Sequence, residues 1–365
     1  MTKRIEYHII QSFAPANLNR DDTGAPKDTV FGGVRRGRIS SQSLKRAVRV
    51  YMRDRGLIPD GARAWRTKRV TSLLAQALRS RGLDDAAAES WAVATIEAIG
   101  SNRKMKVKDG KTEYLMFIGA GEIDRLSELV RETAATGATK VTPELEKQLT
   151  AVLEERGAGT IDVALFGRML ANLPEGNTDA ACQVAHAIST HRVDREFDYY
   201  TAVDDLQPED TAGADMIGTI EFNASCYYRY STINLAQLSA NLQNDDLVKR
   251  AVEAYTRAVV EAIPSGKQNT FAAHNPPSTV FVTVREGQAP RSLTNAFECP
   301  VHPKGDGVLE ESVRRLGEYW QRIDGAYGPA KDAIVLDISG SFSADPVKRV
   351  ETLDQLVLAV LAHVC

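Results

Sequence analysis

The chain has 365 residues, of which 43% are hydrophobic and 25% are charged, a composition typical of soluble globular proteins. No run of about 18 apolar residues predicts a membrane-spanning helix, and the N-terminus lacks the apolar segment of a signal peptide. We therefore expect a cytoplasmic protein that makes no membrane contact. The four cysteines are scattered without a CxxC motif, which favours free thiols in a reducing compartment over a disulfide framework.

The net charge of −3 conceals two blocks of opposite sign. Residues 30–53 contain seven basic residues and no acidic one, whereas residues 194–215 contain eight acidic residues and one basic residue. Charge that is segregated in this way attracts an oppositely charged partner, which for either block includes another copy of the same chain.

The first element is a predicted strand. Ile5, Tyr7 and Ile9 alternate with Glu6 and His8, so the apolar side chains fall on one face of the strand. Residues 15–33 follow with two prolines and three glycines, which predicts a loop. A loop of this length in a compact domain is usually functional.

The next predicted element is a helix that begins at Ser40 or Ser41, because serine is a favoured helix N-cap, and that ends near Arg55 at Gly56. Residues of about 60–190 favour a helical insertion with a basic connector at 103–111. The helices expected there are 68–81, 85–99, 144–155 and 178–189.

Strand patterns return over residues 190–232, where alternation predicts a long hairpin with its tip near residues 207–213. A helix is expected over 235–262 and a strand over 280–284, and helices at 308–325 and 346–363 flank a strand at 333–338. Because strands and helices do not alternate regularly, the pattern predicts an α+β fold with insertions.

The segment 32–53, GGVRRGRISSQSLKRAVRVYMR, is the strongest local signal for function. On a helical wheel one face is apolar and the opposite face carries four cations and an amide, namely Lys45, Arg46, Arg49, Arg53 and Gln42. Arg35, Arg36 and Arg38 precede the helix, and Ser40 and Ser41 bring hydroxyls to its N-terminus. A helix start beside arginines suits phosphate, although a solvated basic face is the alternative.

Five segments resemble the CasC family of CRISPR surveillance-complex subunits and occur in the same order. They are LNRDD (18–22), KDTVFGGVRRGRISSQSLKRA (27–47), DVALFGRML (162–170), DYYTAVDDL (198–206) and PSGKQNTFA (264–272). The resemblance implies an RRM-like (ferredoxin-like) palm, a helical fingers insertion and a β-hairpin thumb. The corresponding expected ranges are 1–59 and 223–365 for the palm, 60–189 for the fingers and 190–222 for the thumb.

The resemblance also implies residue roles. Arg20, Lys27, Gln42, Lys45, Arg46 and Arg49 would line a groove that holds the backbone of a guide RNA, or crRNA. Tyr200, with Tyr199 beside it, would hold a periodic kink in that RNA. Phe166 or Met169, with Arg168 between them, would place a wedge against the bases, and Lys267, Gln268 and Asn269 would add contacts.

These implications describe a backbone subunit of a type I-E Cascade rather than an enzyme. Several copies would line the crRNA together with other Cascade subunits and present its bases to target DNA. Contacts to phosphate and sugar carry no sequence information, so specificity would come from base pairing. No cofactor and no metal are expected.

Other chemistries find little support in the sequence. PSGKQN lacks the first glycine and the Ser or Thr of a Walker A motif, and GAGE (119–122) lacks the third glycine of a dinucleotide fingerprint, with no strand expected before it. His186 and His191 are five residues apart, do not share a helix face, and are interpreted as structural. The cluster Tyr227, Tyr228 and Tyr230 is interpreted as packing rather than as a stacking platform for bases.

Two alternatives remain open at this point. One is a metal-dependent ribonuclease that uses Asp21, Asp22 or Asp28 as metal ligands. The other is an oligomeric scaffold in which the basic block of one copy pairs with the acidic block of the next, and which needs no RNA.

Overall fold

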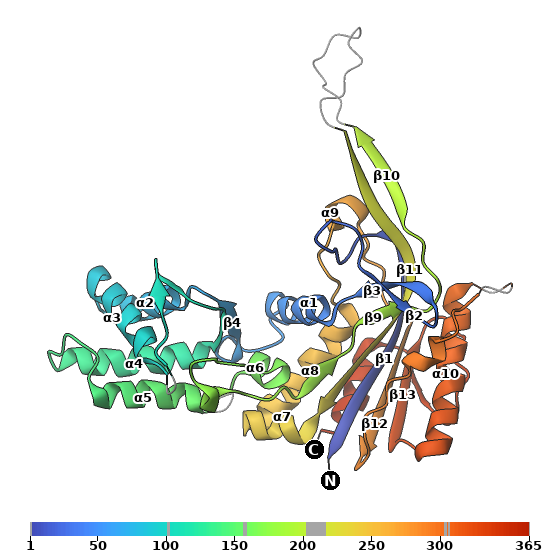
Figure 1. Cartoon of the computed structure of the whole chain (residues 1–365). Coiled ribbons are helices and arrows are strands. Elements are labelled where there is room, and N and C mark those ends of the chain that lie inside the picture. Colours follow the sequence, from blue (N-terminus) through green and yellow to red (C-terminus); the bar gives the residue numbers. More distant parts are fainter. Residues whose placement is uncertain are drawn as a thin grey trace, which may run out of the picture.

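The computed structural model describes residues 2–100, 103–155, 159–201, 217–302, 305 and 307–364. Helices and strands are mixed without regular alternation, as the α+β prediction requires. Figure 1 shows a main body built on a large sheet, a helical block joined to its side, and a long β-ribbon that rises from the sheet. No helix within the described ranges is both long and apolar enough to cross a membrane.

In these residues one sheet organises the main body, in the order β14-β13-β12-β1-β11-β9-β3-β2, with β8 and β10 also paired to β11. Its strands are β1 (Lys3–Ala16), β2 (Asp28–Phe31), β3 (Val34–Ile39), β8 (Cys182–Val184), β9 (Ala187–Ser189), β10 (Glu196–Thr201), β11 (Ile217–Asn234), β12 (Thr279–Glu286), β13 (Asp332–Asp337) and β14 (Lys348–Val350).

The central strand β1 confirms the predicted first strand, but both of its faces are buried. Ile5, Tyr7 and Ile9 enter one core, and the polar residues Glu6 and His8 of the other face are also fully buried. Antiparallel pairing with β11 on one side and β12 on the other leaves β1 no free edge along most of its length.

Helices cover both faces of the sheet (Figure 1). One face carries α1 (Ser41–Asp54), α7 (Leu235–Leu242), α8 (Asp245–Glu261) and α11 (Leu353–Leu361), which share a hydrophobic core with β1. The other face carries α10 (Val308–Tyr327) and the short 3-10 helix at Thr294–Phe297. The short helix α9 (Gln268–Phe271) lies close to the base of the ribbon.

The helical block, residues 64–177, has a hydrophobic core of its own that runs from Val70 to Leu173. It contains α2 (Val70–Ser80), α3 (Asp85–Ala98), α4 (Ala120–Ala135), α5 (Pro143–Glu154), α6 (Ile161–Phe166), and the strand pairs β4 (Ala64–Thr67) with β7 (Met116–Gly119) and β5 (Val107–Lys108) with β6 (Lys111–Thr112). Short 3-10 helices lie at Asp60–Ala62, just before the block, and at Pro174–Gly176. Helix α6 joins the two bodies, because Ile161 and Leu165 belong to the core of the main body.

Several local predictions were wrong. Residues 178–189 form β8 and β9 instead of a helix, because pairing with β11 and β3 overrides their alanine-rich helical propensity. The helix expected over 235–262 is broken at Gln243, which is left-handed, and α8 restarts with Asn244 as its N-cap.

Three further boundaries differ from the expectation. The strand β7 does precede α4 at GAGE. The predicted loop 15–33 is shorter, since β2 and β3 form a hairpin that turns at Gly32 and Gly33. The last helix begins only at Leu353, after β14. The expected hairpin is confirmed in β10 and β11, and its predicted tip, residues 207–213, lies outside the described residues.

Candidate nucleic-acid interface

Helix α1 forms where the sequence predicts it. The Ser40 hydroxyl accepts a hydrogen bond from the Ser43 amide at 3.3 Å, which caps the helix start, and Gly56 follows the helix end with a φ of 63°. Leu44, Val48 and Met52 bury the apolar face. Gln42, Arg46 and Arg53 are exposed, whereas Lys45 and Arg49 are half-buried. In Figure 1 the helix lies at the corner where the helical block meets the main body.

A groove of about 750 Å³ runs beside α1, lined by residues of 18–24, of α1 and of 262–266. Arg20 and Arg46 both line it. The segment 18–24 is fixed to the helix start because the Asn19 side chain accepts a hydrogen bond from the Ser40 amide at 2.8 Å. Gly266 allows the third wall to approach, since a Cβ at this position would lie 2.3 Å from the carbonyl oxygen of Leu18.

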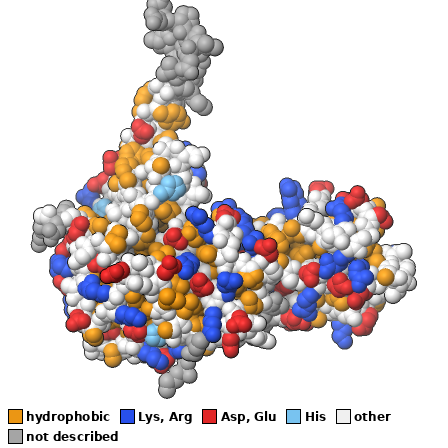
Figure 2. All heavy atoms as spheres, turned by 180° about the vertical axis from the view of Figure 1, so that it is seen from behind, with side chains coloured by type: hydrophobic (Ala, Val, Ile, Leu, Met, Phe, Trp, Pro, Cys, Tyr) orange, Lys and Arg blue, Asp and Glu red, His pale blue; other side chains and the backbone are white. Residues whose placement is uncertain are grey.

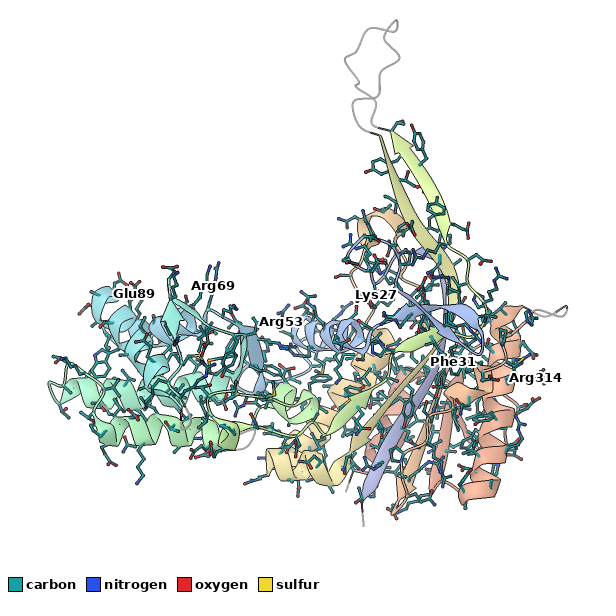
Figure 3. All side chains as sticks on the ribbon, viewed as in Figure 1. Lys27, Phe31, Arg53, Arg69, Glu89 and Arg314 are labelled. Atoms are coloured by element: carbon teal, nitrogen blue, oxygen red, sulfur yellow. The ribbon has the colours of Figure 1, made fainter. Side chains whose placement is uncertain are left out.

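Five cations at and near this groove have no carboxylate partner among the described residues. They are Arg20, Lys27, Arg38, Lys45 and Arg46, and none takes part in an ion pair within 4.0 Å. Most other arginines of the main body are paired, as Arg35 is with Asp28 at 2.5 Å. Figure 3 shows Lys27 near the base of the ribbon and Arg53 at the other end of α1. Asp21, Asp22 and Asp54 also line the groove, but the group of unpaired cations at and near it suits a polyanion.

Two of the arginines predicted to contact RNA are structural. Arg36 is fully buried and donates to the carbonyl oxygens of Ser189 and Phe297 at 3.1 and 2.7 Å. Arg168 is also buried, and its guanidinium donates to the Glu122 carboxylate at 2.5 Å and to the Leu153 carbonyl. A satisfied, buried guanidinium is not available to a phosphate, so these two expectations were wrong.

Arg49 turns away from the groove and toward the helical block. Its Nε lies 3.6 Å from Oδ1 of Asp162, and its Nη2 donates to the carbonyl oxygen of Ala64 at 3.3 Å. The guanidinium also stacks 4.4 Å from the ring centre of Phe117. Burial lowers the pKa of Arg49 and raises the pKa of Asp162. The contacts of Arg49 therefore favour a role in positioning over the predicted phosphate contact.

Ser40 and the segment 267–269 also take part in hydrogen bonds within the protein. The Ser40 side chain serves as the cap of α1 and is buried, whereas Ser41 is half-buried. The Gln268 amide nitrogen donates to the carbonyl oxygens of Pro264 and Ala273, which fixes this turn. Lys267 has a left-handed backbone conformation and is half-buried, whereas Asn269 is exposed.

The ribbon, formed by residues 196–201 and 217–222, presents aromatic side chains to solvent. Phe197 is 66% exposed and Tyr199 is 62% exposed, and both lie on one side of β10. Tyr200 lies on the other side and crosses Gly218, where a Cβ would sit 2.4 Å from the tyrosine ring. Figure 2 shows hydrophobic side chains gathered along the ribbon. Phe197 is not among the residues predicted from the sequence, although its spacing of two from Tyr199 is a signal that both lie on one side of a strand.

Phe166 and Met169 differ in their surroundings. Phe166 is half-buried, packs against the core of the main body and lies 6.3 Å from the ring of Tyr255. Met169 is 79% exposed. Of the two predicted wedge residues, Met169 is the more exposed.

Two of the three acidic residues of the ribonuclease alternative, Asp21 and Asp28, have structural partners. Asp28 lies between Arg35 and Arg195, at 2.5 and 2.8 Å, and hydrogen bonds from these residues lower its pKa against the opposing effect of burial. Asp21 accepts hydrogen bonds from Thr23 and Ala25, which close its own turn. Within the part of the chain that the structure describes, no three potential ligands gather as a metal site.

The tyrosine cluster packs as the sequence predicts. Tyr227 and Tyr228 are buried, and the Tyr228 hydroxyl bonds His8 at 2.8 Å. His191 is likewise structural, because its Nε2 accepts a hydrogen bond from the amide of Cys226 at 3.1 Å. The sheet face with Tyr228 and Tyr230 is covered by α10, and Tyr227 packs on the other face against Phe13 and Leu44, so the cluster offers no stacking platform for bases.

Comparison with known proteins identifies close relatives. The family described as CT1975-like protein matches residues 5–359. A chain of a structure titled "CRISPR RNA-guided surveillance complex, pre-nicking" is 33% identical with a TM-score of 0.87, over 99% of this chain and 100% of that chain. A chain of a second "CRISPR RNA-guided surveillance complex" is 29% identical with a TM-score of 0.76, over 98% and 99%. No curated protein matches the chain.

Proposed function

Because the chain belongs to the CT1975-like protein family, we propose that it is a crRNA-binding backbone subunit of a type I-E Cascade. The observation that carries this proposal is the likeness, over 99% of the chain, to a component of an RNA-guided surveillance complex. The unpaired cations beside the groove are the feature of the molecule itself that supports RNA as the ligand. In this role the chain binds and orients RNA and catalyses no reaction.

The main body is the RRM-like palm in this proposal. Four strands lie side by side in the order β12-β1-β11-β9, and each is antiparallel to its neighbours. Helices α1 and α8 pack on one face of these strands. This is the arrangement of a ferredoxin-like unit in which α1 follows the first strand and α8 follows the third. The helical block is inserted after α1. The ribbon is inserted between β9 and the part of β11 that begins at residue 223.

We assign the fingers to the helical block and the thumb to the ribbon. The fingers end near residue 177 rather than at 189, because β8 and β9 pair within the palm sheet. The palm then comprises residues 1–59, about 178–189 and 223–365, and the thumb keeps the range 190–222. One continuous strand, β11, joins thumb and palm.

The RNA backbone lies along the groove beside α1 in this proposal. Arg20, Lys27, Arg38, Lys45 and Arg46 neutralise phosphates, and Gln42, Lys267 and Asn269 add hydrogen bonds. These contacts are indifferent to sequence, as a subunit that must hold any guide requires. Each neutralised phosphate releases counterions, so binding falls as salt rises.

The exposed aromatic residues of the thumb separate bases of the RNA. Tyr200 is the proposed residue that holds the kink, Tyr199 and Phe197 offer further rings on the other side of the ribbon, and Met169 of the fingers also meets the bases. Stacking on such side chains tolerates any base. The remaining bases face outward and pair with target DNA, while further copies of the chain and other Cascade subunits complete the complex.

The test is to co-express the chain with a guide RNA and to measure RNA content by absorbance at about 260 and 280 nm during size exclusion. The proposal predicts a large RNA-bearing species for wild type and its loss for Lys45→Ala with Arg46→Ala. Lys249→Ala with Arg250→Ala is a matched control, because this exposed Lys-Arg pair on α8 lies outside the groove. Equal RNA loss in both double variants would refute the proposal that the groove beside α1 binds RNA.

A further inference from the structure

Three nitrogen-bearing side chains, those of Lys27, Arg38 and His186, lie together beside the groove. His186 is interpreted as structural from the sequence, but its side chain is exposed. Lys27 precedes β2, Arg38 lies in β3, and His186 is exposed between β8 and β9. The Nη1 of Arg38 lies 3.3 Å from Nδ1 of His186. Lys27 and Arg38 line a small pocket that shares Leu18 and Asn19 with the groove, so the cluster adjoins the groove.

The contact with Arg38 fixes the protonation of His186. A guanidinium only donates hydrogen bonds, so Nδ1 of His186 must accept and the proton of the neutral ring sits on Nε2. Partial burial and the charges of Arg38 and Lys27 lower the pKa of His186. Without a ligand the cluster therefore holds two cations and a neutral imidazole, whose Nε2–H is a donor.

We propose that Lys27, Arg38 and His186 together bind one phosphate of the RNA, and that His186 takes up a proton when the phosphate enters. This inference rests on the proposed function and adds to it a contact residue and a linked proton. Phosphate supplies the negative charge that the cluster lacks. A protonated imidazole can no longer accept from Arg38, so that Arg38 donor and both ring N–H groups become available to phosphate oxygens.

The other charges around His186 support the same direction. Lys45 is on α1, which packs against β8, and its charge acts on Cys182 of that strand, so α1 brings no negative charge to this side. The nearest carboxylate on β2, Asp28, is held by Arg35 and Arg195. The negative charge that favours the protonated ring must then come from the ligand, and RNA affinity rises as pH falls.

The test measures the affinity of the full-length chain for a mixed-sequence single-stranded RNA by fluorescence anisotropy between about pH 8 and pH 6. For wild type, affinity increases several-fold toward acid and by no more than about tenfold per pH unit, because one proton is linked. His186→Gln keeps a polar side chain and abolishes this increase. His302→Gln, which removes an exposed histidine that does not line the groove, behaves as wild type.

A permanent charge provides the complementary variant. His186→Lys binds with an affinity that is independent of pH and at least equal to that of wild type near pH 6. RNA binding without pH dependence in wild type, or pH dependence that survives in His186→Gln, would overturn the inference and leave the proposed function intact. An absence of RNA binding at every pH would overturn both.

Discussion

Arg49 of α1 and Asp162 of α6 form an ion pair that joins the palm to the helical block, with Nε of Arg49 3.6 Å from Oδ1 of Asp162. The other carboxylate oxygen of Asp162 accepts the Ala64 amide at 2.9 Å. The pair thus fixes α1, which borders the groove, against the first strand of the block.

The first prediction separates positioning from RNA contact. Arg49→Ala lowers the free energy of unfolding by about 3 kcal/mol, because it leaves the buried carboxylate of Asp162 without its partner. It leaves the salt dependence of RNA binding unchanged, whereas Arg46→Ala reduces the slope of log affinity against log salt by about 1. Urea denaturation and binding titrations at several salt concentrations measure both. A reduced slope for Arg49→Ala would instead indicate that Arg49 contacts an RNA phosphate.

A second prediction concerns the buried charges of the central strand. Arg285 Nε donates to Glu6 at 2.6 Å with both side chains fully buried, so Arg285→Met strands the Glu6 charge and costs about 3–5 kcal/mol. Lys331→Met breaks the neighbouring exposed pair with Glu286 and costs about 1 kcal/mol or less. Denaturant midpoints compare the two, and similar losses would argue against the buried network.

His8 provides a prediction of pH dependence. Burial lowers the pKa of His8 to about 4 from its ordinary value of 6.5, so the unfolded chain binds this proton more readily than the folded one. Stability therefore falls as pH decreases from 6.5 to about 4, by up to about 3 kcal/mol from this residue. His8→Phe removes this contribution, and the difference between the two stability curves across pH isolates it. Parallel curves would contradict the assignment.

The fourth prediction tests the support of Tyr200. Gly218→Ala places a methyl group against the tyrosine ring and displaces it, so that it mimics Tyr200→Ala. Both variants keep their RNA affinity but lose the periodic pattern of guide reactivity in chemical probing of the assembled complex. Thr219→Ala, an exposed neighbour on β11, retains the pattern. If Gly218→Ala also retains it, Tyr200 does not depend on this glycine.

Features with local causes were predictable from the sequence. Helix α1 carries its own cap and its own apolar stripe, so Ser40, Leu44 and Val48 identify it without reference to the rest of the chain. The sequences of β1 and β12 place apolar residues at alternate positions, Ile5, Tyr7 and Ile9 in one strand and Val280, Val282 and Val284 in the other, so both strands are predictable for the same reason.

The failures have non-local causes. Residues 178–189 are strands only because β11, about forty residues away, offers them partners, and propensity alone favours a helix. Arg36, Arg49 and Arg168 look like surface cations in the sequence. Carbonyl oxygens and acids from distant segments, such as Phe297 and Glu122, determine where they point. Phe197 lies one residue before the segment 198–206 that carries the resemblance, so the resemblance does not indicate it.

The strand β11 runs without interruption from residue 217 in the ribbon to residue 234 at the far side of the sheet, a span of roughly 60 Å at about 3.3 Å per residue. Beyond the ribbon it pairs with β1 from Ala16 to Arg4. The ribbon therefore continues directly into the ladder between β11 and β1, which lies in the middle of the palm sheet. A sideways load on the outer end of the ribbon is therefore shared by many main-chain hydrogen bonds of this ladder, and the ion pair between Arg195 and Asp28 supports the ribbon at its base.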